Sequence, residues 1–179
     1  MHKDVESILV SQEEINIIVS DIAEKINKDL NDEPLLVVII LKGSTPFAMD
    51  LIKKLTMPVE IDFMQASSYG TTTESKGFIN MKRDLEQDVT GKNLLIVEDI
   101  IDSGNTLNKI KTLFESRNAK SVRICTMLDK PSRRVVDVKV DYVGKEIPDE
   151  FVIGYGLDYC EQYRNLPYVG ILKRSVYEK

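Results

Sequence analysis

Three carboxylates fall close together in the segment Val97–Thr106, which reads Val-Glu-Asp-Ile-Ile-Asp-Ser-Gly-Asn-Thr. Two of them, Glu98 and Asp99, interrupt the otherwise apolar run Leu94–Ile101, where burial disfavours charge. A plain junction between a strand and a surface turn does not need acids inside such a run. With Asp102, these acids are suited to hydrogen-bonding hydroxyl groups or to accepting a proton. The segment is therefore the first candidate for a chemical site.

A short polar turn follows these acids and leads into a helical pattern. The apolar residues after the turn recur at helical spacing: Leu107, Ile110, Leu113 and Phe114. Free backbone N–H groups at a helix start, together with the helix dipole, favour a bound anion. Neighbouring carboxylates would repel a phosphate unless they serve hydroxyl groups of the same ligand, so the pattern predicts a ribose 5-phosphate site. The predicted phosphate-binding turn consists of Ser103, Gly104, Asn105 and Thr106.

The first third of the chain predicts alternating helices and strands. Ser11–Glu14 reads as a capping box in front of an amphipathic helix that runs to about Leu30. Seven consecutive apolar residues, Leu35–Leu41, indicate a central parallel strand. A turn over residues 42–46 then leads into a second helix, with Thr45 as the predicted N-cap and Pro46 at its first position. The apolar face expected of that helix consists of Phe47, Leu51, Ile52 and Leu55.

The remaining segments predict strands around one long irregular loop. Eight of the eleven residues in Ser67–Gly77 are Ser, Thr or Gly, a composition that favours a functional lid or a disordered loop. The later strand candidates are 59–63, 78–81, 122–128, 136–142, 151–155 and 168–172. The range 136–142 is a candidate because its valines alternate with polar residues. Strand–helix alternation predicts an α/β fold, a mostly parallel twisted sheet flanked by helices. Ligands bind such sheets at the carboxyl ends of the strands, where the 42–45 turn and the 98–106 segment lie.

Length and charge restrict the function classes. At 179 residues the chain fits one domain, which we expect to span 1–179. A formal charge of −5 and a pI near 5.1 argue against a general nucleic-acid binder. We find no signal peptide and no apolar run of membrane-spanning length, so we expect a cytoplasmic protein without a membrane partner. Cys125 and Cys160 lack metal-ligand partners and are predicted to be reduced thiols.

Several motifs together resemble a known family. Val97–Thr106 resembles the phosphoribosyl-diphosphate signature of the type I phosphoribosyltransferases. Over roughly residues 35–173 the chain resembles the hypoxanthine-guanine branch of that family, in five motifs that occur in the same order. Besides the signature, these motifs are Leu41–Ser44, Ser67–Gly70, Lys130 after a strand, and the C-terminal stretch Ile147–Val152 with Gly154–Tyr159. The resemblance also implies a small hood built from chain-terminal segments.

The resemblance assigns residues to the purine base. Lys130 would contact the 6-oxo group of hypoxanthine or guanine, and a fixed positive donor would face the amino donor of adenine, which disfavours that base. Phe151 would stack on the purine ring, and Val152 would present backbone groups to its edge. Asp102 would be the catalytic residue, exchanging a proton with purine N7 while the glycosidic bond forms at N9.

The resemblance also assigns residues to the sugar, the diphosphate and a metal. Glu98 and Asp99 would hold the ribose hydroxyls directly or through Mg²⁺, the expected cofactor, and Asp158 would bind a second such ion. Lys42, the Lys42–Gly43 backbone and Arg164 would contact the diphosphate, with Ser68 and Tyr69 in a closing lid. The peptide joining the residue at Lys42 to its neighbour can be cis in the family, and the sequence leaves open whether Lys42–Gly43 is.

The expected activity is therefore purine salvage: transfer of phosphoribose from phosphoribosyl diphosphate to hypoxanthine or guanine, with xanthine as an open third base. The alternatives are a nucleotide-sensing regulatory protein on the same fold and a xanthine-preferring transferase. A regulatory protein would be expected to show a basic surface or a lost acid within 98–102, and the sequence shows neither. The family commonly forms dimers or tetramers, so a homo-oligomer is expected.

Overall fold

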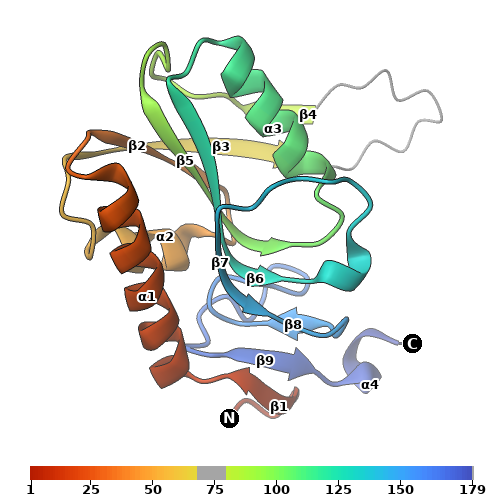
Figure 1. Ribbon diagram of the computed structural model, residues 1–179. Coiled ribbons are helices and arrows are strands. Elements are labelled where there is room, and N and C mark those ends of the chain that lie inside the picture. Colours follow the sequence, from red (N-terminus) through yellow and green to blue (C-terminus); the bar gives the residue numbers. More distant parts are fainter. Residues whose placement is uncertain (68–79, 179) are drawn as a thin grey trace.

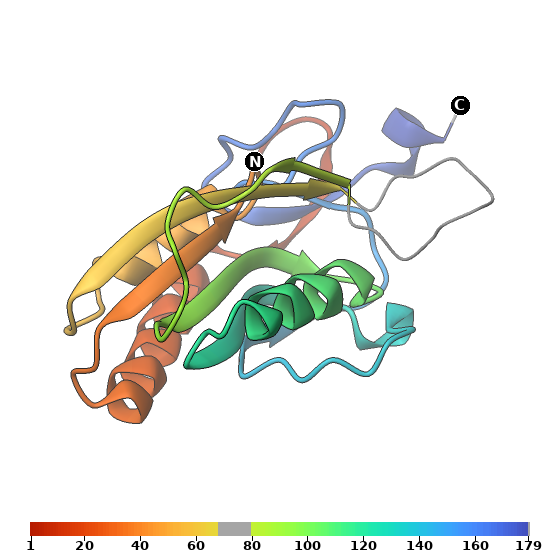
Figure 2. The ribbon, with the colours of Figure 1, turned by 90° about the horizontal axis from the view of Figure 1, so that it is seen from above.

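A six-stranded, mostly parallel sheet forms the centre of the protein, which a computed structural model describes over residues 1–67 and 80–178 (Figure 1). Only β4 runs antiparallel to its neighbour. The sheet is strongly twisted, as the view from above shows (Figure 2). Its strands, in order across the sheet, are β4 (Asn80–Arg83), β3 (Val59–Ser67), β2 (Leu35–Ile40), β5 (Asn93–Ile101), β6 (Ser121–Asp129) and β7 (Tyr142–Glu146). The predicted fold class is confirmed.

Helices cover both faces of this sheet. Alternate residues of the buried strand β2 point to opposite faces, so Val37 packs with α1 (Gln12–Leu30) and α2 (Thr45–Ile52), and Val38 packs with α3 (Asn105–Ser116). The start of α1 confirms its predicted cap, because the Ser11 hydroxyl accepts a hydrogen bond from the Glu14 N–H at 3.2 Å.

The start of α2 differs from the prediction by one residue. Ser44, not Thr45, is the N-cap, and Thr45 is the first helical residue. The buried Ser44 hydroxyl donates to the carbonyl of Ile40, and the Thr45 hydroxyl donates to the carbonyl of Lys42 at 2.9 Å. Both side chains therefore tie the helix back to the end of β2 instead of capping its N–H groups. The helix ends at Ile52, before the predicted Leu55.

A second, antiparallel sheet forms the predicted hood from the two ends of the chain. Its strands are β1 (Val5–Val10), β9 (Val169–Leu172) and β8 (Val152–Ile153), with β9 in the middle, and the short helix α4 (Arg174–Tyr177) follows β9. Both termini lie beside this sheet (Figure 1). Val10, Val152 and Val169 belong to the same apolar cluster as α1 and β2, so the hood packs directly on the main core.

The strand predicted for residues 136–142 is wrong. A 3₁₀ turn at Pro131–Arg133 is followed by irregular chain, and the strand β7 begins only at Tyr142. The N–H groups of Val135 and Val136 donate to the Ser103 carbonyl at 3.1 and 3.2 Å instead of entering a ladder. Alternating valines fit both structures, because Val138 is buried on the α3 side of the sheet without belonging to a strand.

The order of the strands creates a crevice at one edge of the molecule. From β2 the chain passes to β3 on one side, and it adds β5 on the other side. The loops after β2 and β5 therefore separate at the carboxyl end of the sheet, the usual place of a ligand site in this architecture. Both cysteines are free, with Cys125 buried and Cys160 exposed. None of the helices in the described ranges combines the length and apolarity of a membrane span.

Candidate active site

The turn predicted to bind phosphate lines a cavity of about 480 Å³ at this edge. Gly104 caps α3 with a φ of +82°, which residues with side chains rarely adopt, and a Cβ there would lie 2.8 Å from a Val138 methyl group. Ser103, Gly104 and Thr106 line the cavity, whereas the exposed Asn105 bonds to the Ser103 hydroxyl at 3.2 Å. Within the described ranges, the N–H groups of Gly104 and Thr106 donate no hydrogen bond. They are available to an anion.

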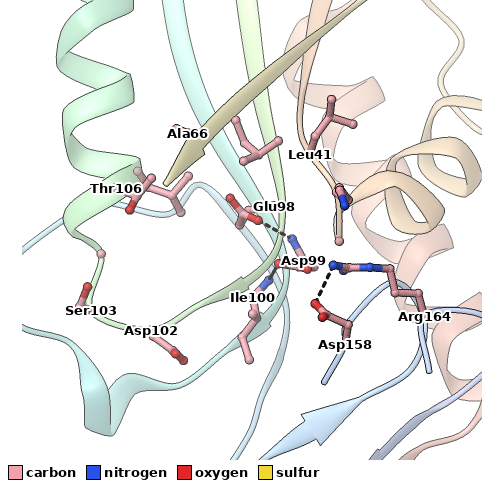
Figure 3. A pocket seen from close by; sticks show the side chains of 15 residues that line it. Leu41, Ala66, Glu98, Asp99, Ile100, Asp102, Ser103, Thr106, Asp158 and Arg164 are labelled. Carbon is pink, nitrogen blue, oxygen red and sulfur yellow. Dashed lines mark hydrogen bonds and ion pairs between the residues drawn. The ribbon is translucent and has the colours of Figure 1, made fainter. Parts of the chain in front are cut away.

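The two adjacent acids on β5 lie between this turn and the opposite wall of the cavity (Figure 3). The Asp99 carboxylate accepts a hydrogen bond from the Ile100 N–H at 2.7 Å, and the Glu98 carboxylate accepts one from the Asp99 N–H at 3.3 Å. Burial raises the pKa of Glu98 well above its usual range, and the neighbouring Asp99 charge raises it further. Burial also raises the pKa of Asp99, although hydrogen bonds from Glu98 and from Ile100 N–H oppose that rise. The site thus holds acids that a cation or hydroxyl donors would stabilise.

Two glycines let three segments meet closely at these acids. A Cβ on Gly43 would lie 1.7 Å from an oxygen of Asp99, and a Cβ on Gly156 would lie 1.9 Å from the Gly43 carbonyl oxygen. Gly156 also has a φ of +99°, so both space and backbone conformation require glycine there. The cis peptide in this region joins Leu41 to Lys42, one bond before the Lys42–Gly43 peptide named from the sequence.

Arg164 and Asp158 form the wall opposite the phosphate-binding turn (Figure 3). The Arg164 guanidinium pairs with an Asp158 oxygen at 2.7 Å and donates to the Gly156 carbonyl at 2.7 Å. Its Nε is buried and has no partner among the described residues. Lys42 lies at the same end of the cavity and pairs with Glu161 at 3.1 Å. The predicted diphosphate contacts thus come together, although they are 122 residues apart in the chain.

A second cavity of about 230 Å³ adjoins the first. Ile100, Asp102 and Asp158 line both cavities. The other lining residues of the second cavity include those predicted for the base, Lys130, Phe151 and Val152, together with Leu157. The ring of Phe151 stacks on Tyr177 of α4, with the centroids 5.0 Å apart, and meets the edge of Tyr159 at 5.6 Å. These two aromatic neighbours therefore hold Phe151 in place. The contact of Phe151 with Tyr177 of α4 was not predicted from the sequence.

Asp102 occupies the junction of the two cavities. The buried Lys130 ammonium lies 3.9 Å from an Asp102 oxygen and 3.9 Å from an Asp149 oxygen, beyond direct hydrogen bonds. The same Asp102 oxygen is buried and has no hydrogen-bond partner among the described residues. An unpaired buried acceptor of this kind is suited to accept a hydrogen bond from a ligand.

An ion pair outside the predicted site holds this junction. Arg134 donates through Nε to the Asp102 carbonyl at 3.1 Å and pairs with the buried Asp129 at 2.5 Å. These contacts, with the bonds from 135 and 136 to Ser103, fix the loop after β5 from outside. Arg134 is not among the predicted site residues, and the sequence signal for it is an arginine four residues after Lys130.

The described residues do not by themselves complete a metal site. Within residues 1–67 and 80–178, no group of three or more His, Cys, Asp and Glu side chains is placed to hold a metal ion. Asp158 pairs with Arg164. The donor set, hard carboxylate oxygens with room for further ligands, fits a Mg²⁺ that takes its other ligands from water and phosphate. The predicted substrate contacts Ser68 and Tyr69, and most of the predicted lid, lie outside the described residues.

This geometry agrees with comparisons to known proteins. Residues 6–160 match a family model described as phosphoribosyl transferase domain. The chain belongs to the phosphoribosyltransferase family. The match covers every part of the site up to Asp158, and Arg164 lies just beyond it.

Individual members of the phosphoribosyltransferase family are similar over almost the whole chain. A hypoxanthine-guanine phosphoribosyltransferase of Bacillus subtilis is 50% identical over 178 residues, covering 99% of both chains. A crystal structure of a hypoxanthine phosphoribosyltransferase from Staphylococcus aureus has a TM-score of 0.95 at 48% identity and covers 100% of this chain and 97% of that one. A crystal structure of a hypoxanthine-guanine phosphoribosyltransferase from Bacillus anthracis, with HEPES in its active site, has a TM-score of 0.90 at 45% identity. The match covers 94% of this chain and 99% of that one.

Proposed function

We propose that this phosphoribosyltransferase acts in purine salvage. It transfers the 5-phosphoribosyl group of phosphoribosyl diphosphate to hypoxanthine or guanine, giving IMP or GMP and diphosphate, with residues 1–179 as one domain. The observation that carries this proposal is the position of Asp102, which lines both a cavity bordered by a phosphate-binding turn and a cavity that holds Lys130 and Phe151. A reacting base and a reacting sugar would meet there.

The two cavities would orient the two substrates. The free N–H groups of Gly104 and Thr106 would bind the 5′-phosphate, which would place the sugar over Glu98 and Asp99. In the second cavity the Lys130 ammonium would donate to the 6-oxo group of the base, Phe151 would stack on its ring, and Val152 would bond its edge through the backbone. Both substrates would then be held with N9 facing C1′ of the ribose.

The transfer breaks the bond between C1′ and the diphosphate oxygen and forms the bond between C1′ and N9. The diphosphate leaves with the electron pair of the broken bond, and Lys42, the Gly43 backbone and Arg164 would receive its negative charge. Positive charge develops on the sugar, where the neighbouring carboxylates of Glu98 and Asp99 would stabilise it. Asp102, through its unpaired oxygen, would accept the proton that the base loses at N7.

Mg²⁺ is part of this proposal. When bound, it would supply positive charge that offsets the charge of the phosphates. Glu98 and Asp99 would hold the ion on the ribose side, and Asp158 would hold a second one on the diphosphate side after releasing Arg164. The raised pKa values of the two adjacent acids support a cation at that place, because a neighbouring positive charge favours their ionised forms.

One assay tests the proposal. Purified protein, Mg²⁺ and phosphoribosyl diphosphate are incubated with hypoxanthine, guanine, xanthine or adenine in turn, and the nucleotide product is measured. We expect IMP and GMP, and little or no AMP. Turnover with adenine alone would overturn the role of Lys130, turnover with xanthine above the other bases would favour the xanthine-preferring alternative, and nucleotide binding without turnover of any base would favour the regulatory one.

Three further parts of the proposal concern the protein as a whole. A homo-oligomer, a dimer or a tetramer, is expected, and light scattering of the purified protein measures it directly. A cytoplasmic location and the absence of a nucleic-acid partner stay predictions from charge and composition.

Contacts of Ser68 and Tyr69 with substrate are tested by their substitution with alanine, which should lower transfer more than it lowers binding of a 5′-phosphate.

A further inference from the structure

A third charged group occupies the end of the cavity where Lys42 and Arg164 meet. One oxygen of the Glu161 carboxylate lies 3.1 Å from the Lys42 ammonium and 3.2 Å from the Arg164 guanidinium. Lys42 and Arg164 line the cavity, whereas Glu161 is not among its lining residues. The carboxylate thus bridges from the rim two cations that come from distant parts of the chain.

The backbone around Glu161 has an uncommon shape that brings this carboxylate to the rim. Cys160, Glu161 and Tyr163 have φ values of +52°, +62° and +75°, in the left-handed region that residues other than glycine rarely adopt. The Glu161 N–H donates to the second oxygen of Asp158 at 2.9 Å, and Tyr159 and Gln162 pair through their backbones. Backbone strain of this kind is concentrated at functional sites.

We propose that Glu161 is an internal substitute for the leaving diphosphate. In the free enzyme it occupies Lys42 and Arg164, and diphosphate has to displace it. This inference rests on the proposed function, which assigns the diphosphate to those two cations. Glu161 is therefore a positioning residue that competes with the ligand and takes no part in the chemical step.

The bonds that Glu161 makes are of the kind that a phosphate oxygen would make. Carboxylate and phosphate oxygens both accept charge-assisted hydrogen bonds from ammonium and guanidinium groups. The bonds from Lys42 and Arg164 lower the pKa of Glu161, so its carboxylate is charged at neutral pH. The side chains of Glu161 and Lys42 are 65% and 55% exposed, so solvent screens their ion pair and little free energy is needed to break it.

Competition of this kind has a measurable consequence. A carboxylate that must leave weakens the binding of diphosphate, and it speeds release of the product by taking back the two cations. Removing its charge while keeping its size, with Glu161→Gln, should therefore tighten diphosphate binding about three- to tenfold, the range of two weak, solvent-screened ion pairs. Product inhibition by diphosphate should become stronger by the same factor, and the KM for phosphoribosyl diphosphate should fall more than kcat does.

The experiment compares three forms of the whole protein by titration calorimetry with Mg²⁺ and inorganic diphosphate: wild type, Glu161→Gln and Glu24→Gln. The last removes the same charge from an exposed position on α1. Ribose 5-phosphate, which should bind at the 103–106 turn, is the control ligand. We expect tighter diphosphate binding in Glu161→Gln alone and equal ribose 5-phosphate binding in all three.

Failure of this inference is distinct from failure of the proposed function. If wild type transfers phosphoribose and Glu161→Gln binds diphosphate equally or more weakly, Glu161 does not compete with the ligand, and only this inference is overturned. If Glu24→Gln also binds diphosphate more tightly than wild type, the effect comes from net charge, and this inference is overturned as well. If wild type neither transfers phosphoribose nor binds diphosphate, the proposed function itself is overturned.

Discussion

The two adjoining cavities are built in different ways. The first takes three of its four acids and its anion-binding turn from nine consecutive residues, 98–106, at the end of one strand. The second collects Asp102, Lys130, Phe151 and Val152 from the ends of three strands and the chain between them. Their electrostatics differ too. The first contains adjacent acids with raised pKa values, whereas in the second the buried Lys130 ammonium lies 3.9 Å from an Asp102 oxygen.

This difference separates two tasks of the site. A sugar phosphate offers hydroxyl groups, a phosphate and a developing positive charge, so adjacent acids that are costly in the empty protein become useful once it binds. A purine offers a flat ring and a few polar atoms, so one fixed ammonium among apolar walls is enough to select it. Asp102 belongs to both cavities, and its replacement tests how they are coupled.

The largest expected effect follows from Asp102→Asn. The variant keeps the shape of the side chain but removes the proton acceptor at the junction, so kcat for hypoxanthine should fall about 10²- to 10⁴-fold while the KM for phosphoribosyl diphosphate changes little. Steady-state kinetics measure this. Asp149→Asn is the matched control, because Asp149 also lies 3.9 Å from Lys130 but does not line the first cavity. Equal losses in the two variants would mean that both acids act only as partners of Lys130.

A smaller effect, confined to the base cavity, is expected from Lys130→Met. Loss of the donor leaves the 6-oxo group unpaired, at a cost of about 1–3 kcal/mol, so kcat/KM for hypoxanthine should fall roughly ten- to a hundredfold. Adenine has an amino group at that place, so kcat/KM for adenine should fall less. The ratio of kcat/KM for hypoxanthine to kcat/KM for adenine should therefore decrease. Lys25→Met, an exposed substitution on α1, removes the same charge. If this ratio stays constant, Lys130 does not discriminate between the two bases.

The same contrast explains how much could be predicted from the sequence. Glu98, Asp99, Asp102 and the 103–106 turn form one contiguous pattern, and local rules for burial and helix starts are enough to place them. Lys130, Phe151 and Val152 have ordinary sequence surroundings, and a core phenylalanine has the same pattern as a stacking one. For those residues the family resemblance supplied the prediction.

The errors come from contacts between distant segments. Residues 136–142 alternate as a strand does, but the N–H groups of Val135 and Val136 donate to the Ser103 carbonyl on a neighbouring loop. The roles of Arg134 and Glu161 depend on partners 32 and 119 residues away in the chain. Thr45 met the composition rule for an N-cap, and the short link to β2 moved the cap to Ser44. Only the cap is a local case; tertiary hydrogen bonds decided the others, and no local pattern encodes those bonds.

The smallest expected effect concerns the first cavity and appears in stability. Burial and the Asp99 charge raise the pKa of Glu98, so the folded protein binds a proton more tightly there than the unfolded chain does. Stability from this group is therefore present at low pH and is lost as pH rises from about 4.3, the unfolded value, through the folded pKa. Glu98→Gln removes the buried charge, and at pH 8 without Mg²⁺ we expect it to stabilise the protein by about 1 kcal/mol, although it should lower activity.

Urea unfolding of wild type, Glu98→Gln and Glu24→Gln at several pH values between 5 and 8 measures this effect. The stability difference between Glu98→Gln and wild type should grow with pH, while Glu24→Gln, which removes an exposed charge, should show no such trend. A difference that does not change with pH would mean that Glu98 is as easily ionised in the folded protein as in the unfolded chain. The acids of the first cavity would then cost nothing in the empty protein, and the electrostatic contrast with the base cavity would disappear.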